Sequence, residues 1–256
     1  MYAVPLSPPK ASPVVVLVTP VWNDSRRFGR YGPGLARALA ESGLPVRWII
    51  ADDGSSVREQ AELKTMVAGL RAIYASVELD LSGQRTRKGG AICRAWDSGA
   101  EADWLAFVDG DGAIDAESMV GLMRTAMEGE SNICVVAIRK NTPETPVRRS
   151  MIRSIAMRIF SLLARWIVGL HCIDTQCGAK VVPGAAYREV RGKLKEQGFV
   201  FDLELLLALE RSGCRIQVQA VRWREVPDGK VSLIRDGWQM IAGLLRIRRR
   251  LNRGAY

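Results

Sequence analysis

The sequence predicts an α/β fold in which helices flank a mostly parallel sheet. Short apolar runs alternate with helix-length amphipathic segments between residues 14 and 138, which is the pattern of a doubly wound sheet. Each apolar run also stops at a polar cluster, as buried strands do where they open into loops. A chain of 256 residues is long enough to bury one large core of this kind.

The individual elements follow from hydrophobic periodicity. The first strand, Val14–Thr19, is an unbroken apolar run that ends in a threonine. The helix after it contains Leu35 and Leu39 and ends at Gly43, a residue type that favours helix C-termini. The other predicted strands are 46–51, 75–81, 104–108 and 132–138; the other predicted helices are 58–72, a segment that follows a basic loop at 84–90 and runs through residue 95, and 116–127.

The strongest candidate site follows the fourth strand, where Asp109 and Asp111 are separated by one glycine. The glycine leaves the backbone free to turn, so both carboxylates can face the same point. Mg²⁺ and Mn²⁺ are usually bound by one or two such carboxylates together with substrate phosphates. Alternatively the segment is a solvated turn, in which Asp111 or Asp115 caps the helix that follows.

Other polar clusters also follow predicted strands. The carboxyl ends of parallel strands share one edge of a sheet, and ligands bind beyond that edge. The pattern therefore predicts a nucleotide–metal site with acids for a cation and bases for phosphates. Taken singly, Asp52 or Asp53 can be a turn former and Lys88 a solvated loop charge. The clusters are Asn23 and Asp24, Asp52 and Asp53, Lys88, Asp109 and Asp111, and Arg139.

Composition limits the partner and the compartment. Lys and Arg outnumber Asp and Glu by 37 to 27, and the resulting net charge of +10 favours an anionic partner such as a nucleotide, a phospholipid surface or nucleic acid. The five scattered cysteines suit reduced thiols better than a disulfide framework. The leader 1–13 lacks the apolar core of a signal peptide, and no apolar run reaches the roughly 18–20 residues of a membrane span. We expect a cytoplasmic protein.

Six short motifs between Val14 and about Met240 occur together in one known family. They are Pro20–Asp24, Asp52–Ser56, Lys88–Ala91, Asp109–Ala113, Asp174–Lys180 and Phe199–Glu204. Together they resemble the inverting GT-A glycosyltransferases of family 2, and within that family the polyprenyl-phosphate sugar synthases. The sequences DTQCG and DGA are most similar to the glucosyltransferase branch. The resemblance implies a GT-A fold, which is Rossmann-like.

The resemblance also implies roles for individual residues. Asp53 would bind the uracil or ribose of a nucleotide sugar, and Asp109 and Asp111 would hold Mg²⁺ or Mn²⁺ at its diphosphate. Asp174 would lie close to the reacting centre, and Lys230 resembles the lysine of a loop that folds over the donor phosphates. The implied donor-binding residues are Pro20, Asn23, Asp24, Asp53, Lys88, Gly89, Asp109 and Lys230.

Some positions depart from the family pattern or have a structural alternative. Asp228-Gly229 replaces the usual Gly-Ser before Lys230, and Ala113 stands where mannose synthases often carry a glutamine metal ligand. Asp174 can also cap a turn. Three further residues have alternatives of this kind: Asp202 and Glu204 can hold a buried arginine, and Cys177 can be a small buried residue.

Two basic amphipathic segments predict contact with a membrane. Segment 148–170 places Ile152, Ile155, Ile159, Leu162, Leu163, Trp166 and Leu170 on one helical face. The tail places Met240, Leu244, Ile247 and Leu251 on one stripe, opposite Arg246, Arg249, Arg250 and Arg253. Either segment can be a core helix, but we expect at least one to lie peripherally on the inner face of a membrane. The expected organisation is a flexible leader 1–13, a catalytic domain 14–234 that includes segment 148–170, and a basic amphipathic helix 235–256.

The resulting functional prediction is transfer of a hexose from a nucleotide sugar to a polyprenyl phosphate, with inversion. We expect glucose as the sugar and UDP-glucose as the donor. A lipid monophosphate with a second pKa of about 6 is mostly dianionic at pH 7, so it needs little help from a general base. Bases that position it should matter more. Arg149 and Arg153 are the candidates for acceptor binding, and Asp174 and Arg139 are the catalytic candidates.

Three alternatives remain open. A soluble family 2 transferase that uses a hydroxyl acceptor would need a base, for which Asp174 is the candidate. A nucleic-acid-binding protein is compatible with the charge, but we find no recognised binding module and expect no nucleic acid partner. A non-catalytic scaffold disagrees with the intact pair Asp109 and Asp111.

Overall fold

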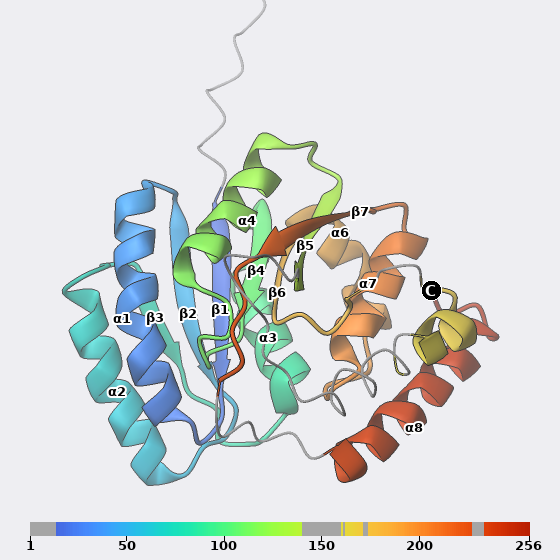
Figure 1. The fold of residues 1–256 in the computed structure, drawn as a ribbon, viewed down its shortest axis with the longest axis horizontal. Helices are drawn as coiled ribbons and strands as arrows, with labels where there is room; N and C mark the ends of the chain where they lie inside the picture. Colours follow the sequence, from blue (N-terminus) through green and yellow to red (C-terminus); the bar gives the residue numbers. More distant parts are fainter. Residues whose placement is uncertain (1–13, 140–159, 161, 171–173, 227–232) are drawn as a thin grey trace, which may run out of the picture.

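A seven-stranded sheet with the order β3-β2-β1-β4-β6-β5-β7 forms the centre of the computed structural model (Figure 1). The structure describes residues 14–139, 160, 162–170, 174–226 and 233–256. The strands are β1 (Val15–Val21), β2 (Val46–Asp52), β3 (Val77–Asp80), β4 (Trp104–Val108), β5 (Ile133–Arg139), β6 (Ala179–Pro183) and β7 (Arg215–Val221). The five strands expected from the sequence are all present, each close to its predicted bounds.

The sheet is mostly parallel, as predicted, with β6 running the other way. β1 pairs in parallel with β2 and β4, while β6 is antiparallel to both β4 and β5. The alternation of strands and helices did not predict β6. It is a strand of five residues interrupted by a lysine, so it lacks the uniform apolar run of β4. Because β6 is reversed, its amino end lies at the edge where β4 and β5 end.

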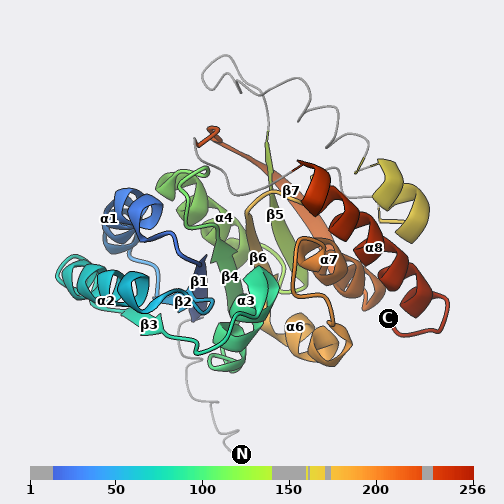
Figure 2. The same ribbon diagram turned by 90° about the horizontal axis from the view of Figure 1, so that it is seen from below.

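Helices cover both faces of this sheet (Figure 2). One core cluster holds the apolar side chains of α1, α2 and α4, and a second holds those of α3, α6, α7, α8 and the helical segment 162–168. The helices are α1 (Ser25–Ser42), α2 (Val57–Arg71), α3 (Arg87–Asp97), α4 (Ala116–Glu128), α6 (Gly184–Val190), α7 (Phe201–Arg211) and α8 (Leu233–Leu251), with a 3-10 turn η1 at Arg191–Lys193.

Local chemistry explains several helix ends. Gly43 has φ +65°, a left-handed conformation that suits glycine, and ends α1 where the sequence predicts. Asp115 caps α4, because its side chain accepts a hydrogen bond from the Ser118 amide at 2.7 Å. α3 begins at Arg87, so Lys88 lies in the first turn of a helix and the predicted basic loop is shorter than expected.

The two amphipathic segments place their predicted apolar residues differently. In segment 162–168, Ala164 and Val168 are buried whereas Leu162 and Trp166, two members of the predicted apolar face, are 66% and 84% exposed, so these two members point away from the core. Residues 164 and 168 are one helical turn apart and point at the core, which turns 162 and 166 outward. In α8, the predicted stripe packs on the core: Leu244 and Ile247 are buried, and Met240 and Leu251 contact the same cluster.

Candidate active site

The predicted polar clusters meet at one edge of the sheet, at the carboxyl ends of β1, β2, β4 and β5. Asp109 and Asp111 follow β4 and Arg139 ends β5. The motif Asp174–Gly178 joins them because it directly precedes the reversed strand β6, whose residue Ala179 pairs with Val108. Sequence alternation could not place this motif, since its position depends on the direction of β6.

Asp109 is the outer end of a row of four alternating charges. Lys88 Nζ lies 2.9 Å from Asp109 Oδ1 and 3.2 Å from Asp202 Oδ2. Lys180 Nζ lies 2.6 Å from the other oxygen of Asp202 and donates to the Cys177 carbonyl at 3.0 Å. Burial alone would raise the pKa of Asp202, but the two ammonium groups hold it below its ordinary value. The alternative that Asp202 and Glu204 hold a buried arginine is therefore wrong for Asp202, which holds two lysines, whereas the buried Glu204 does pair with Arg250, at 2.8 Å.

Gly178 lets Asp109 occupy this position. A Cβ added at residue 178 would lie 2.2 Å from Asp109 Oδ2, and the Asp109 amide donates to the Gly178 carbonyl at 2.8 Å. Any side chain at residue 178 would displace the carboxylate. The glycine of the DTQCG motif and the first aspartate of the DGDG motif thus depend on each other through strand pairing.

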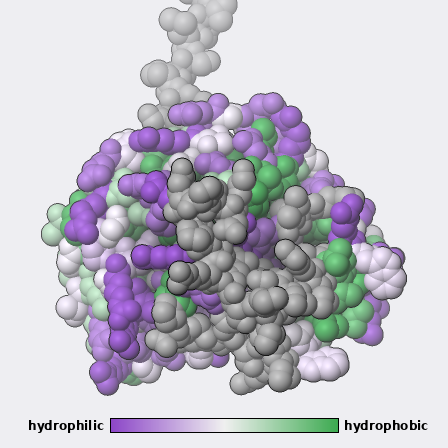
Figure 3. Space-filling model, in the orientation of Figure 1, coloured by the Kyte–Doolittle hydropathy of each residue, from purple (hydrophilic) through white to green (hydrophobic). Residues whose placement is uncertain are grey.

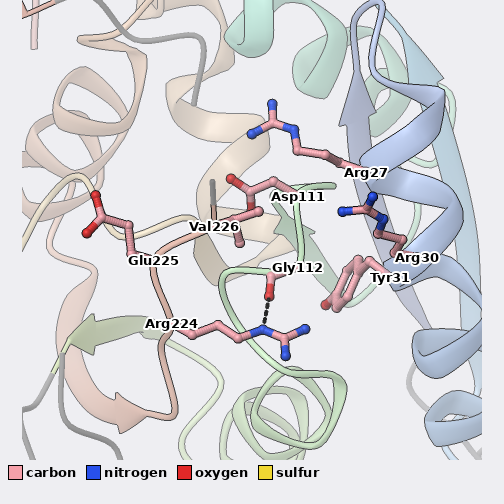
Figure 4. A pocket seen from close by; sticks show the side chains of 8 residues that line it. All are labelled: Arg27, Arg30, Tyr31, Asp111, Gly112, Arg224, Glu225 and Val226. Atoms are coloured by element: carbon pink, nitrogen blue, oxygen red, sulfur yellow. Dashed lines mark hydrogen bonds between the residues drawn. The ribbon is translucent and has the colours of Figure 1, made fainter. Parts of the chain in front are cut away.

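Asp111 is positioned by its own loop and faces a cavity of about 290 Å³. Its Oδ1 accepts a hydrogen bond from the Ala113 amide at 2.9 Å. Arg30 and Tyr31 of α1 and Arg224 line the same cavity, and the Arg224 side chain extends under Gly112 towards Tyr31 (Figure 4). The remaining lining residues are Arg27, Gly112, Glu225 and Val226. The cavity therefore combines guanidinium groups, which suit anions, with a carboxylate that suits a cation.

Asp53 is buried at the end of β2. Its Oδ1 accepts hydrogen bonds from the Thr86 amide at 2.6 Å and the Thr86 hydroxyl at 3.1 Å. Burial raises the pKa of Asp53 against the opposing effect of these bonds. Beside it, the Arg85 guanidinium lies 3.3 Å from the centre of the Trp22 ring. Asp53, the residue predicted to bind the nucleotide, therefore lies near an aromatic ring on which a cation is stacked.

The turn after β1 is joined to the turn after β2. The Asn23 amide donates to Ser55 Oγ and the Ser56 amide donates to Asn23 Oδ1, both at 2.8 Å. Asp52 accepts from the Ser55 amide at 3.1 Å and from Gln60 at 2.8 Å, so it is a turn former, as one alternative proposed. These bonds hold the two turns together at the edge of the site.

Three predicted donor-binding residues are already engaged within the protein or lie in the strand itself. Asp24 forms an ion pair with Arg27. The Gly89 amide donates to the Gln197 carbonyl at 2.8 Å, and a Cβ at residue 89 would lie 2.4 Å from the ring of Phe201. Close packing of α3 on α7 explains this glycine without a phosphate. Pro20 lies within β1.

Arg139 and Asp174 form a bidentate pair. Arg139 Nε donates to Asp174 Oδ2 at 2.7 Å, the Arg139 amide donates to the same oxygen at 3.1 Å, and Arg139 Nη2 pairs with Oδ1. Burial would raise the pKa of Asp174, but Arg139 holds it below its ordinary value. Arg139 also lies 5.7 Å from the centre of the Trp223 ring. The structure therefore brings the two catalytic candidates together, and each is the ion-pair partner of the other.

Three predicted residues lie outside the described part of the chain. They are the acceptor-binding candidates Arg149 and Arg153 and the donor-binding candidate Lys230. Their roles stay predictions.

The residues present suit a divalent cation. Burial raises the pKa of Asp109; Lys88 opposes this shift and the charge of Asp111 adds to it, so a cation shared by the two carboxylates would relieve their repulsion. Within the described residues, no three His, Cys, Asp or Glu side chains form a complete metal-binding group. Further ligands would have to come from phosphates and water, as is usual for Mg²⁺.

Comparison with known sequences identifies relatives of one kind. The chain matches the family described as Glycosyl transferase family 2 over residues 18–185. It is 30% identical over 225 residues to the dolichyl-phosphate beta-glucosyltransferase of Saccharomyces cerevisiae, covering 82% of this chain and 67% of that protein. It is 27% identical over 235 residues to the glycosyltransferase AglD of Haloferax volcanii, covering 91% of this chain and 36% of that protein.

Solved structures share the fold. The glucosyl-3-phosphoglycerate synthase of Mycobacterium tuberculosis is similar with a TM-score of 0.65 and 19% identity, covering 93% of this chain and 82% of that one. A structure of the same enzyme in complex with Mn²⁺, UDP and glucosyl-3-phosphoglycerate has a TM-score of 0.62 and 16% identity, covering 93% and 81%. The predicted GT-A fold is confirmed.

Proposed function

Because this chain belongs to glycosyltransferase family 2, we propose that it transfers glucose from UDP-glucose to a polyprenyl phosphate, with inversion at the anomeric carbon. The relatives named dolichyl-phosphate beta-glucosyltransferase support both the sugar and the kind of acceptor. The single observation that carries the proposal is the pair Asp109 and Asp111 at the carboxyl end of β4, with Lys88 Nζ 2.9 Å from the first carboxylate.

In this proposal, Asp109 and Asp111 hold Mg²⁺ or Mn²⁺ at the donor diphosphate. A bound cation would neutralise charge that develops on the departing nucleoside diphosphate. The Mn²⁺ and UDP in the structural neighbour support the choice of ion and nucleotide. Asp53 and Trp22 are the residues we assign to the nucleotide base and ribose, since they follow β2 and β1, and these strands lie in the order β2-β1-β4 in the sheet.

The state of Asp174 favours a phosphate acceptor over a hydroxyl acceptor. A hydroxyl must lose its proton, and a general base works best with a pKa near the working pH. Asp174 has a lowered pKa, and both of its oxygens are bonded to Arg139. A phosphate dianion needs no such base. We therefore assign Asp174 to holding Arg139 in place, with Arg139 helping to position the acceptor.

Exposed apolar side chains support the proposal that the protein acts at a membrane surface. Segment 162–168 and α8 lie side by side (Figures 1 and 2). In Figure 3, hydrophobic residues gather at the lower right, where these elements lie. Trp238 is 71% exposed. Arg165, Arg248 and Arg249 are exposed nearby in the sequence, a composition typical of interfacial helices. The other large apolar residues that are exposed among the described side chains of these two elements are Leu162, Trp166, Ile241 and Leu245.

None of the helices in the described ranges is long and apolar enough to cross a membrane. The exposed apolar residues of segment 162–168 and α8 lead us to propose peripheral attachment through these side chains. That this surface faces the cytoplasm stays a prediction from the sequence.

The test is a transfer assay with labelled UDP-glucose, Mn²⁺ or Mg²⁺, and a short polyprenyl phosphate, followed by extraction into organic solvent. Label in the organic phase supports the proposal, whereas label that stays entirely in water contradicts it. Asp111→Asn should abolish most of the transfer. Asp115→Asn is the matched control, because asparagine also caps a helix and Asp115 is bonded to the Ser118 amide.

A second assay separates the two acceptor classes. Asp174→Asn should keep transfer to lipid phosphate within about tenfold of the parent, because no proton has to be removed. Loss of a general base would instead lower transfer to a hydroxyl acceptor by about 10²–10⁴-fold. Efficient, Asp174-dependent transfer to small alcohols would favour the soluble alternative.

Attachment to membranes has its own measurement. Co-sedimentation with vesicles that contain anionic lipid should fall in the double variant Trp166→Gln and Trp238→Gln, because both side chains are exposed and apolar. Trp48→Phe, a substitution in the buried core, serves as the control. Equal binding by all three proteins would contradict the assignment of this surface.

A further inference from the structure

Asp202 is shared by two lysines in a way that the proposed donor and acceptor chemistry does not explain. Its Oδ1 lies 2.6 Å from Lys180 Nζ and its Oδ2 lies 3.2 Å from Lys88 Nζ. Only Lys88 reaches Asp109, at 2.9 Å. Both lysines also lie over the ring of Phe107, with their Nζ atoms 4.7 Å and 5.1 Å from its centre. The two ammonium groups therefore share one carboxylate and one aromatic ring.

The row changes from buried to exposed along its length. The Lys180 side chain is 0% exposed and that of Asp202 4%, whereas Lys88 is 28% and Asp109 37% exposed. Lys180 is also held by the Cys177 carbonyl at 3.0 Å. The inner end is therefore fixed by burial and hydrogen bonding, and the outer end opens at the edge of the site. Lys88 is the member that has two partners and partial exposure.

A divalent cation on Asp109 would meet the ammonium group of Lys88 at the same carboxylate. Like charges that share a ligand oppose each other, so Lys88 and the cation compete for Asp109 unless Lys88 has another partner. Asp202 is that partner, already within ion-pair distance on the buried side. Lys88 would therefore keep this ion pair, at 3.2 Å, when a cation occupies Asp109.

We propose that Asp202 is a positioning residue that holds Lys88 away from Asp109 when a cation binds, while Lys180 limits how strongly it does so. The inference rests on the proposed function, because it assumes that Asp109 is a cation ligand. It predicts opposite effects for two changes in the same buried row. Without the charge of residue 202, Lys88 stays on Asp109 and weakens cation binding. Without Lys180, Asp202 belongs to Lys88 alone and cation binding tightens.

The experiment measures the affinity of the protein for Mn²⁺ alone, from the free Mn²⁺ signal in electron paramagnetic resonance. The proteins compared are the parent chain, Asp202→Asn, Lys180→Met, Lys88→Met and the double variant Asp202→Asn with Lys88→Met. We expect Asp202→Asn to weaken Mn²⁺ binding by about tenfold, and Lys180→Met and Lys88→Met to tighten it several-fold, within the range of coupling between contacting groups. In the Lys88→Met background, Asp202→Asn should change the affinity by less than about twofold. Thermal unfolding establishes that each variant is folded.

The outcomes separate this inference from the proposed function. Weaker binding in both Asp202→Asn and Lys180→Met would indicate a merely structural row and overturn the inference. If Asp202→Asn weakens Mn²⁺ binding equally in the parent chain and in the Lys88→Met background, the inference is overturned as well. If Asp202→Asn does not fold, tightening in both lysine variants supports the inference and weakening in either overturns it. A parent chain that binds no Mn²⁺ overturns the inference together with the proposed cation site.

Discussion

Asp109 and Asp111 are two residues apart, yet the structure holds them in different ways. Asp109 is positioned by distant segments: Lys88 of α3 pairs with its carboxylate, and Gly178 leaves room for it. Asp111 is positioned by its own loop through the Ala113 amide, and it faces the open cavity lined by α1. One carboxylate therefore depends on long-range packing, and the other depends on local backbone geometry.

This contrast shows how a short acidic motif can combine one carboxylate that packing holds in place with another that faces an open cavity. The Asp109 side lies against the core that includes α3 and α7, where buried charges are paired. The Asp111 side lies against α1, where Arg30 and Arg224 are exposed around the cavity. Substitutions far from the motif should therefore affect Asp109 more than Asp111.

The largest expected effect comes from removing either carboxylate. Asp109→Asn and Asp111→Asn should each lower the rate of glucose transfer by about 10²–10³-fold, because each removes part of a charge-neutralising site worth several kcal/mol. Initial rates with labelled UDP-glucose at a fixed Mn²⁺ concentration provide the measurement. A rate within threefold of the parent for one variant would show that the two carboxylates do not act as a pair.

The next effect concerns Asp174, which is held at long range like Asp109. At pH 7, Asp174→Asn should lower the free energy of unfolding by about 3 kcal/mol, because it leaves the largely buried Arg139 without its carboxylate. The pKa of Asp174 is lowered in the folded chain, so its contribution is present above the ordinary value of 3.8 and is lost as the pH falls below it. Urea titrations at pH 7 and pH 3 check this. If Asp174→Asn lowered the free energy of unfolding equally at both pH values, the charge pairing would be contradicted.

Substitutions at two glycines test the Asp109 side and the Asp111 side of the motif directly. Gly178→Ala should weaken Mn²⁺ binding and glucose transfer by about tenfold, because the new Cβ would lie 2.2 Å from Asp109 Oδ2. Gly112→Ala places a Cβ 3.2 Å from the Tyr31 ring at φ +74°, so it should cost about 1 kcal/mol of stability and change the Mn²⁺ affinity less. Isothermal titration of both variants with Mn²⁺ gives the change in affinity, and chemical unfolding gives the change in stability. The reverse order of affinities would break the contrast between the two carboxylates.

The smallest effect is expected at Tyr31 on the Asp111 side. Its hydroxyl is buried and has no hydrogen-bond partner among the described residues. Removing an unsatisfied buried hydroxyl relieves a desolvation cost, so Tyr31→Phe should leave the free energy of unfolding unchanged or raise it by about 1 kcal/mol. Equilibrium unfolding in urea measures this. A loss of stability would mean that the hydroxyl has a partner in solution.

Local patterns were sufficient for most of the first half of the fold. Five strands were predictable because each is a short apolar run between polar turns, and Gly43 and Asp115 act at helix ends as their residue types predict. The common edge for Asp53, Asp109 and Arg139 followed from the parallel arrangement. For the two amphipathic segments, periodicity identified the apolar residues but not whether protein or lipid covers them.

The amino-acid sequence was enough to predict an α/β chain with an acidic pair at the end of its fourth strand, since strand periodicity and turn chemistry act over a few residues. Tertiary structure alone decided that β6 is reversed, that Gly178 accommodates Asp109, and that Lys180, Asp202 and Lys88 form one row behind it. These contacts join residues as far apart in the sequence as Lys88 and Asp202. Which charges neutralise each other there depends on how the elements pack, and no local pattern records that packing.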